Sequence, residues 1–150
     1  MRTMLYLDTT VPSALLDERA PDRRQLTERF WREGLQRYLP VVSTVVLAEI
    51  RDTPDDLKRA RMEELVAGFG VLPFSDEADN LAREYVKRGA FLEKHISDAI
   101  HVAIAVVNDV TYLASWNFKH LVKVNTRREV NLVNSIMGYG QIEIVAPPEL

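Results

Sequence analysis

The sequence predicts an α/β protein: a three-layer α/β/α sandwich in which helices cover both faces of a mainly parallel sheet of about five strands. Two observations predict this class. Short runs rich in β-branched residues alternate with longer helical patterns along the whole chain, which is typical of parallel strands joined by right-handed crossovers. The segment 96–107 is apolar nearly all round, so its helix must be buried on most sides. No repeat or linker interrupts this order, so we expect one domain over residues 1–150.

The composition excludes several classes of protein. A chain of 150 residues, 47% apolar and 27% charged, is long enough for one hydrophobic core. It contains no cysteine, which rules out thiol nucleophiles and disulfide scaffolds. No apolar run reaches the roughly 18 residues of a membrane span, and the N-terminal apolar run is too short for a signal peptide. We therefore expect a cytoplasmic protein with no membrane partner.

The first half of the chain is predicted to contain two strands, each followed by helices. Both strands are short apolar runs, and Pro40 opens the second. A Thr shortly before a Pro indicates a helix start, which predicts N-caps at Thr10 and Thr53. The expected elements are a strand at 4–8, a helix from Thr10, a helix at 22–39, a strand at 41–44, a short helix begun after Ser43 or Thr44, and a helix from 53 to about 67.

The second half continues the alternation of strands and helices. Ser75, with the acids that follow it, is typical of a helix N-terminus, where carboxylates face the positive end of the helix dipole. The expected elements are a strand at 71–74, a helix from 75 to near 89, the buried helix at 96–107, a strand at 111–115, a helix near 129–137 and a strand at 142–145.

Four polar side chains follow or flank successive elements of this sheet. They are Asp8 at the end of the first strand, Glu49 in the helix after the second, Asp98 in the first turn of helix 96–107, and Asn117 after the fourth strand. Each alone has an ordinary explanation as a solvated residue, a helix cap or a turn residue. Together they can meet in the crevice at the carboxyl ends of the strands, where parallel sheets bind ligands.

Three carboxylates in one crevice would repel one another and raise one another's pKa values unless a cation neutralised them. Mg²⁺ or Mn²⁺ is the natural neutraliser, because hard cations prefer oxygen ligands. Such a site activates water and stabilises charge on a scissile phosphate. No Ser–His–Asp or Cys–His arrangement is evident, so we expect water to be the nucleophile.

The segments around these residues resemble a PIN domain, the fold of VapC-type toxin ribonucleases. The matching pieces are LYLDTTVPSALL around Asp8, VVSTVVLAEI around Glu49, HISDAIHVAIAV around Asp98 and YLASWNFKHLV around Asn117. The fourth family position is commonly Asp. Asn117 keeps an acceptor oxygen there but removes one charge, which puts a second tightly bound metal in doubt.

The resemblance implies a Mg²⁺- or Mn²⁺-dependent endoribonuclease that is the toxin of a type II toxin–antitoxin system. It implies catalytic roles for Asp8, Glu49, Asp98 and Asn117, with the three acids binding the metal. The hydroxyl of Thr10 would support the site. The resemblance also implies two protein partners, a small antitoxin and a second copy of the chain in a homodimer.

Basic residues follow Asn117, although the chain as a whole has a net charge of −3. The segment is therefore a candidate to hold the RNA backbone through Lys119, Lys123, Arg127 and Arg128, unless it is a solvated helix face. Trp116 either stacks on a base or packs, and His101 either orients Asp98 or packs. The arginines of 22–39 are interleaved with acids and are expected on an exposed, charge-mixed face: Arg23, Arg24, Arg29, Arg32 and Arg37.

Two other functions are compatible with the residues. A non-catalytic PIN-fold module that binds RNA or protein is favoured by Asn117. Metal dependence separates it from the nuclease, because chelation or Asp98→Asn would abolish cleavage and leave a binding module unaffected. An aspartyl-phosphate enzyme is suggested by the LDTT motif, but that chemistry usually needs a second Asp where Thr10 stands.

Overall fold

The computed structural model of this chain describes residues 2–150 and contains one five-stranded sheet. The strands lie in the order β3-β2-β1-β4-β5, and all four pairings are parallel. Their bounds are β1 Thr3–Leu7, β2 Tyr38–Ser43, β3 Gly70–Leu72, β4 Tyr112–Ala114 and β5 Glu143–Val145. The predicted number of strands and their parallel orientation are confirmed.

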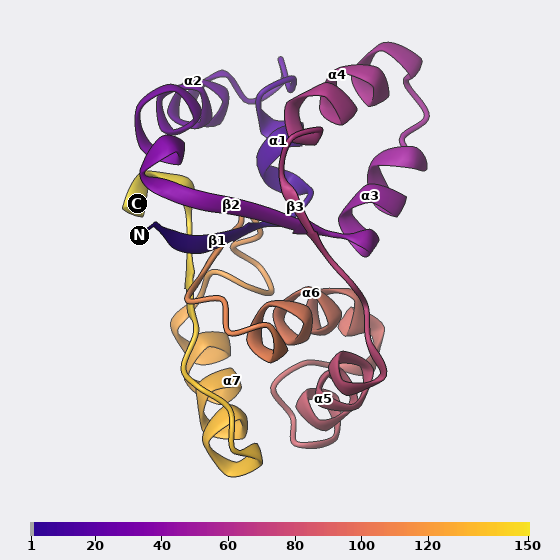
Figure 1. The fold of residues 1–150 in the computed structure, drawn as a ribbon, viewed down its shortest axis with the longest axis vertical. Coiled ribbons are helices and arrows are strands. Elements are labelled where there is room, and N and C mark those ends of the chain that lie inside the picture. Colours follow the sequence, from indigo (N-terminus) through magenta and orange to yellow (C-terminus); the bar gives the residue numbers. More distant parts are fainter. Residues whose placement is uncertain (1) are drawn as a thin grey trace.

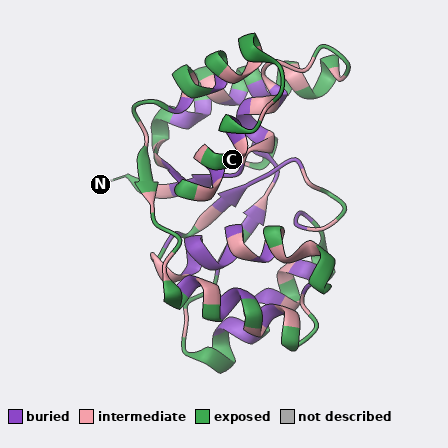
Figure 2. Ribbon diagram, turned by 90° about the vertical axis from the view of Figure 1, so that its right-hand side faces the viewer, coloured by how far each residue is buried: buried purple, intermediate pink, exposed green. Residues whose placement is uncertain are grey.

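Helices cover both faces of the sheet, which confirms the predicted three layers (Figure 1). One layer contains α1 Thr10–Ala14, α2 Pro21–Arg29, α3 Thr44–Arg51 and α4 Asp56–Val66. The other contains α5 Asp76–Lys87, α6 Ile96–Val107 and α7 Val124–Met137. Buried residues gather between the layers (Figure 2). Helix α6 is buried without interruption from His101 to Val106, as its all-round apolar sequence predicts.

The segment 22–39 is helical only as far as Arg37 and is not a single α-helix. After α2 the chain winds into a π-helix at Phe30–Gly34 and a 3₁₀ turn at Leu35–Arg37. A Cβ on Gly34 would stand 3.1 Å from Cδ1 of Phe30, so glycine allows this wide turn to close on the ring. Further 3₁₀ turns lie at Glu93–His95 and Pro147–Glu149.

Strand β2 begins at Tyr38, two residues before the Pro40 that was expected to open it. Pro40 pairs with Leu5 of β1, whereas β3 pairs with β2 only from Val41 onward. The missing N–H of Pro40 therefore faces no neighbouring strand and removes no ladder hydrogen bond, which is why proline is tolerated inside this strand.

Two predicted helix caps are wrong. Thr10 is the first residue of α1, after Thr9, and its hydroxyl donates to Asp8 rather than to the helix backbone. Helix α4 begins after Asp55 instead of Thr53, because the Asp55 carboxylate accepts from the Lys58 backbone N–H at 3.0 Å. Ser75 caps α5 as predicted, through the Ala78 N–H at 3.1 Å.

Helix α7 begins at Val124, five residues before the predicted start at 129. Its buried stripe is Thr126, Val130, Val133 and Asn134, which has helical spacing. The first of these positions is polar, so an apolar pattern alone does not reveal it. Gly138 ends the helix in a left-handed conformation with φ of 85°.

The topology places a crevice at the carboxyl ends of β1 and β4. The chain passes from the central β1 to β2 and β3 on one side, and later to β4 and β5 on the other. Crossovers leave neighbouring strands in opposite directions at such a switch point, which opens a space for a ligand. Asp8 follows β1 and Ser115 follows β4 at this point. None of the helices in residues 2–150 combines the length and apolar character needed to cross a membrane.

Candidate active site

Asp8, the first residue after β1, has hydrogen bonds to both carboxylate oxygens. Its Oδ1 accepts from the Thr10 backbone N–H at 3.0 Å and from the Thr10 hydroxyl, and its Oδ2 accepts from the Ser115 hydroxyl at 2.5 Å. The side chain is only 3% exposed. Burial raises the pKa of Asp8, although the charge of His101 and these hydrogen bonds oppose the rise. A buried carboxylate in this condition is stabilised by any cation brought beside it.

Glu49 projects from α3 and is held by two donors on the same oxygen. Its Oε1 accepts from the Thr9 hydroxyl at 2.5 Å and from His101 Nε2 at 2.9 Å. Burial alone would raise the pKa of Glu49, but the hydrogen bond and charge of His101, with the Thr9 and Ser97 hydroxyls, lower it below its ordinary value. Glu49 is therefore held as an ionised carboxylate.

Asp98 and Asn117 form the more open part of the site. The Asn117 amide donates to Asp98 Oδ1 at 3.3 Å, and the backbone N–H of Asn117 donates to Ser115 Oγ at 2.9 Å. A continuous chain of hydrogen bonds thus runs from Asp98 through Asn117 and Ser115 to Asp8. Burial raises the pKa of Asp98, with a further contribution from the charge of Glu49 and opposition from three nearby histidines. The structure therefore brings all four predicted catalytic residues to one edge of the sheet.

His101 connects the acids to the core. Its Nε2 lies 2.9 Å from Glu49 Oε1, and its Nδ1 lies 2.7 Å from the Tyr6 hydroxyl. That hydroxyl is 2.8 Å from Ser43 Oγ, which also accepts the Val46 N–H and caps α3. His101 is 4% exposed. Its two ring nitrogens thus contact Glu49 and Tyr6, and not the Asp98 carboxylate that His101 was a candidate to orient.

The three carboxylates around His101 raise the pKa of its imidazole. Burial lowers the pKa of His101, but the hydrogen bond and charge of Glu49 and the charges of Asp8 and Asp98 raise it above its ordinary value overall. Among residues 2–150, no group of three or more His, Asp or Glu side chains is arranged to hold a metal ion by itself. The carboxylates therefore favour the protonated form of the imidazole, and the charge of His101 in turn lowers the pKa values of Asp8, Glu49 and Asp98.

The predicted basic segment divides into two parts. Lys119 and Lys123 are exposed. Desolvation lowers the pKa of His120, and the charges of His95 and of these two lysines lower it further, whereas the charge of Asp98 raises it. The lysines, His120 and Asp98 therefore lie in one neighbourhood. Arg127 donates to the Ile144 carbonyl at 3.4 Å. Arg127 and Arg128 line a separate surface hollow with residues of α7. The lysines are thus the predicted basic residues beside the acids.

Trp116 packs, as one of its two predicted roles requires. It is 7% exposed, and its indole N–H donates to Thr27 Oγ1 at 2.9 Å. Its backbone N–H donates to Thr10 Oγ1 at 2.9 Å, so the loop after β4 is tied to the loop after β1. The exposed aromatic ring of this loop is Phe118, which is 48% exposed.

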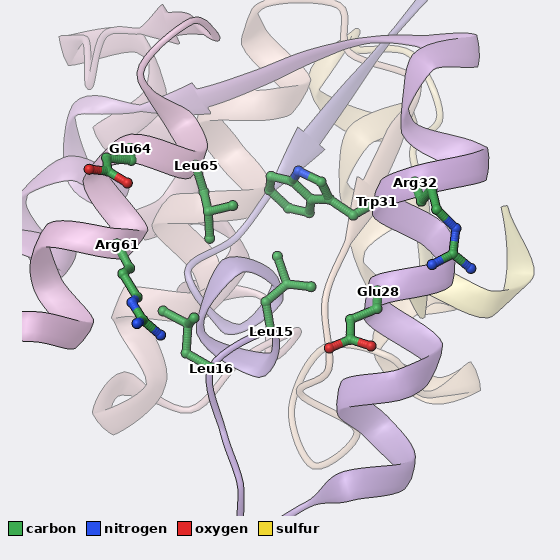
Figure 3. Close-up of a pocket in the computed structure, with 8 residues that line it drawn as sticks. All are labelled: Leu15, Leu16, Glu28, Trp31, Arg32, Arg61, Glu64 and Leu65. Carbon is green, nitrogen blue, oxygen red and sulfur yellow. The ribbon is translucent and has the colours of Figure 1, made fainter.

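Another hollow lies away from the acids, in the layer of α1, α2 and α4 (Figure 3). It has a volume of about 580 Å³, with Leu15, Leu16, Trp31 and Leu65 around an apolar centre. Its lining contains two acids, Glu28, which pairs with Arg24 at 3.3 Å, and Glu64, and it contains none of the predicted catalytic residues. Its lining offers no cluster of carboxylates for phosphate chemistry.

Comparison with known proteins identifies the fold and the family. A chain of the crystal structure of VapBC2 from Rickettsia felis, bound to a DNA fragment from its promoter, has a TM-score of 0.55 and 13% identity over 78% of this chain and 90% of that chain. Mycobacterium tuberculosis VapC20, described as a sarcin–ricin loop cleaving toxin, has a TM-score of 0.60 and 16% identity over 93% of this chain and 98% of that chain. No curated protein sequence matches. Residues 5–117 match the family model of the PIN domain, and the chain therefore belongs to the PIN domain family.

Proposed function

We propose that this single-domain protein is a metal-dependent endoribonuclease and the toxin of a type II toxin–antitoxin system. The observation that carries the proposal is the meeting of Asp8, Glu49, Asp98 and Asn117 at the switch point of the sheet, with hydrogen bonds linking Asp98 to Asp8. Membership of the PIN domain family supports nuclease chemistry. The similarity to VapC20, a sarcin–ricin loop cleaving toxin, supports RNA as the substrate class.

The donor set fits Mg²⁺ or Mn²⁺. The candidate ligands Asp8, Glu49 and Asp98 offer only oxygen, and burial raises the pKa values of both Asp residues. Mg²⁺ commonly keeps several waters and uses one or two carboxylates together with substrate phosphates, so a complete protein cage is not required. A bound ion would lower the pKa of a water molecule and stabilise charge on the scissile phosphate.

The side chains around the acids would fix their orientation. Thr10 and Ser115 occupy three of the roughly four acceptor positions of the Asp8 carboxylate, which leaves it one direction in which to face a ligand. Thr9 and His101 likewise hold Oε1 of Glu49, so this ionised carboxylate would bind the metal or hold the attacking water. Asn117 would complete the polar wall next to Asp98, and Lys119 and Lys123 would contact the RNA backbone.

Cleavage of a mixed RNA pool tests the proposal. We expect the purified protein to cut RNA with Mn²⁺ or Mg²⁺, to stop in EDTA, and to lose activity on Asp8→Asn or Asp98→Asn. Glu129→Gln, a charge-neutralising change on α7 outside the predicted catalytic set, serves as the matched control and should cut normally. Cleavage that persists in EDTA and in both Asp variants would refute the metal-dependent mechanism.

A non-catalytic PIN-fold module that binds RNA or protein is the second candidate. It is favoured by His101, which already stands among the carboxylates, and by the amide of Asn117 in place of a fourth acid. This protein would bind RNA or a protein partner with the same affinity in EDTA and in Mn²⁺, and would leave RNA uncut in both.

We also propose two protein partners and a cytoplasmic location. A small antitoxin is supported by the family and by the similarity to a chain of a VapBC2 complex, and a homodimer by the family alone. Light scattering on the purified chain tests the homodimer. Co-purification from the native host, followed by inhibition of RNA cleavage by the isolated partner, tests the antitoxin.

A further inference from the structure

Arg23 differs from the other arginines of its segment because its guanidinium has no polar partner in residues 2–150. Arg24 pairs with Glu28 at 3.3 Å, Arg29 pairs with Glu33 at 3.2 Å, and Arg37 donates to the Leu150 carbonyl. No hydrogen bond or ion pair involves the Arg23 guanidinium across the described chain, and Arg23 is exposed. The charge-mixed face expected from the sequence is therefore a poor description of this residue.

The guanidinium of Arg23 instead lies on two aromatic rings of the loop after β4. It stands 4.9 Å from the centre of the Trp116 ring and 5.7 Å from that of Phe118. Such contacts orient an arginine but leave its N–H donors free for a ligand. The two rings meet edge to face at 5.9 Å, so the arginine and both rings form one unit.

Buried hydrogen bonds hold this unit in place. The Trp116 indole donates to the Thr27 hydroxyl at 2.9 Å, and that hydroxyl donates to the Arg23 backbone carbonyl at 2.7 Å. Thr27 is fully buried. Helix α2 is thus fastened to the loop at the residue that carries the free guanidinium, so the unit is preorganised.

The unit borders a hollow that reaches the candidate active site. The hollow has a volume of about 200 Å³, and its lining includes Arg23, Trp116 and Thr10. Thr10 binds Asp8 directly. Asp17, the acid of this hollow, pairs with Arg19 at 3.2 Å and so does not neutralise Arg23. On the other side, Phe118 is the next residue after Asn117, whose amide contacts Asp98.

We propose that Arg23 and Phe118 bind one unpaired nucleotide of the RNA substrate, beside the phosphodiester bond that is cleaved. This inference rests on the proposed function and adds a substrate subsite to it. The guanidinium binds the phosphate, since its planar fork matches two phosphate oxygens. The half-exposed ring of Phe118 stacks on the base, which is the usual way in which proteins hold single-stranded nucleic acid. An acidic or apolar peptide would use only one of these two features.

The test measures binding separately from cleavage. All variants are made in the Asp98→Asn protein, and anisotropy in Mg²⁺ follows a short fluorescein-labelled oligouridylate and the same oligomer with abasic riboses. Arg23→Gln should weaken binding of both oligomers about tenfold, because it removes the phosphate contact. Phe118→Leu should weaken binding of the oligouridylate about tenfold and leave the abasic oligomer unchanged. Phe118→Trp should restore it.

Arg29→Gln is the matched control, since it removes the same charge from the same helix where the arginine already has a carboxylate partner. It should change neither affinity more than about twofold. Unchanged RNA affinity in both Arg23→Gln and Phe118→Leu would overturn the proposal and leave this surface to a protein partner. An equal loss in Arg29→Gln would also overturn it, because the effect would then be one of general charge.

Cleavage assays separate this inference from the proposed function. Suppose that the protein with its native Asp98 never cuts RNA, while Arg23→Gln and Phe118→Leu weaken RNA binding as expected. This result would refute the proposed nuclease activity and support the nucleotide site. If the protein cuts RNA and neither Arg23→Gln nor Phe118→Leu changes KM, the nucleotide site is refuted and the nuclease activity is supported. Thermal unfolding of each variant shows whether a lost affinity reflects lost folding.

Discussion

The two sides of the acid cluster differ in how firmly each carboxylate is held. Asp8 accepts three hydrogen bonds within the first turn of α1 and from Ser115, and Glu49 accepts two on one oxygen. Within residues 2–150, Asp98 has a single long contact of 3.3 Å from Asn117, and its side chain is half-buried. The firmly held side is built by the fold itself, and the loosely held side retains free acceptor positions.

This difference separates two tasks that one site must perform. A carboxylate with several fixed donors keeps its orientation when a ligand arrives, which lowers the cost of assembling the site. A carboxylate with free oxygens can exchange water for a cation or follow a moving phosphate. We therefore expect substitutions on the two sides to affect stability, metal affinity and catalysis in different proportions.

The largest expected effects come from removing either buried charge. Asp8→Asn and Asp98→Asn should each lower RNA cleavage by about three orders of magnitude, since several kcal/mol of transition-state stabilisation are lost. In EDTA at neutral pH, Asp8→Asn should melt at a higher temperature than the parent, because it removes a desolvated charge, and Asp98→Asn should gain less. Differential scanning fluorimetry measures this. Equal melting shifts in the two variants would break the comparison.

A pair of substitutions at His101 should separate its contact with Glu49 from its contact with Tyr6. Gln at this position can present an amide N–H near the place of Nε2, whereas Asn reaches only as far as Nδ1. We expect His101→Asn to lower cleavage about 100-fold and His101→Gln about tenfold, since the bond to a charged partner is the stronger one. Mn²⁺ affinity, measured by calorimetry, should weaken more in His101→Asn. Similar losses in both variants would indicate that the ring serves only to fill the core.

The stability of the metal-free protein should depend on pH through the same histidine. A histidine whose pKa is raised in the folded state contributes stability below its ordinary value of 6.5, and this is lost as pH rises through the raised value. The raised pKa values of Asp8 and Asp98 act in the same direction at lower pH. The contribution of Glu49, whose pKa is lowered, disappears only in acid. Melting temperatures in EDTA should therefore fall as the pH rises above about 6.5, and less so in His101→Gln.

The smallest effect is expected from a substitution of Asn117. Asn117→Asp removes the amide that donates to Asp98 and places a like charge beside it. The metal-free protein should lose about 1 kcal/mol of unfolding free energy, while the rise in melting temperature on adding Mn²⁺ should become larger. A smaller rise in melting temperature with Mn²⁺ than in the parent would show that the side chain at position 117 does not face the ion.

The sequence predicts the order of the elements well because their signals are local. The buried helix 96–107 matches α6 at both ends, since its apolar residues and the flanking polar ones mark its limits. The helix boundaries predicted from the sequence are wrong where tertiary contacts determine where a helix begins or ends. The π-helix at Phe30–Gly34 depends on a close contact between Gly34 and Phe30, and α7 begins earlier than its apolar pattern does.

The site was predictable only in part for the same reason. Asp8, Glu49, Asp98 and Asn117 each stand next to an element that could be recognised, so their meeting followed from the parallel topology. The partners of His101 are separated from it by 52 and 95 residues along the chain, and no local pattern indicates them. Arg23 is a mixed case. Arg24 and Arg29 each have a Glu four residues later, whereas Arg23 has Thr27 there, so the sequence shows that an i,i+4 carboxylate partner is missing. The contacts of Arg23 with Trp116 and Phe118, more than 90 residues away, have no local signal.

The hydrogen bond between Ser115 and Asp8 joins residues 107 positions apart. A ribosome releases Asp8 and Glu49 early, but α6 and the loop after β4 emerge only when three quarters of the chain has been made. A growing chain therefore holds the first acids without the residues that orient them, and the central strand β1 lacks one of its neighbours. Under the proposed function, a translation product interrupted before the loop after β4 would be inert, and cleavage of RNA could begin only after this loop has been made.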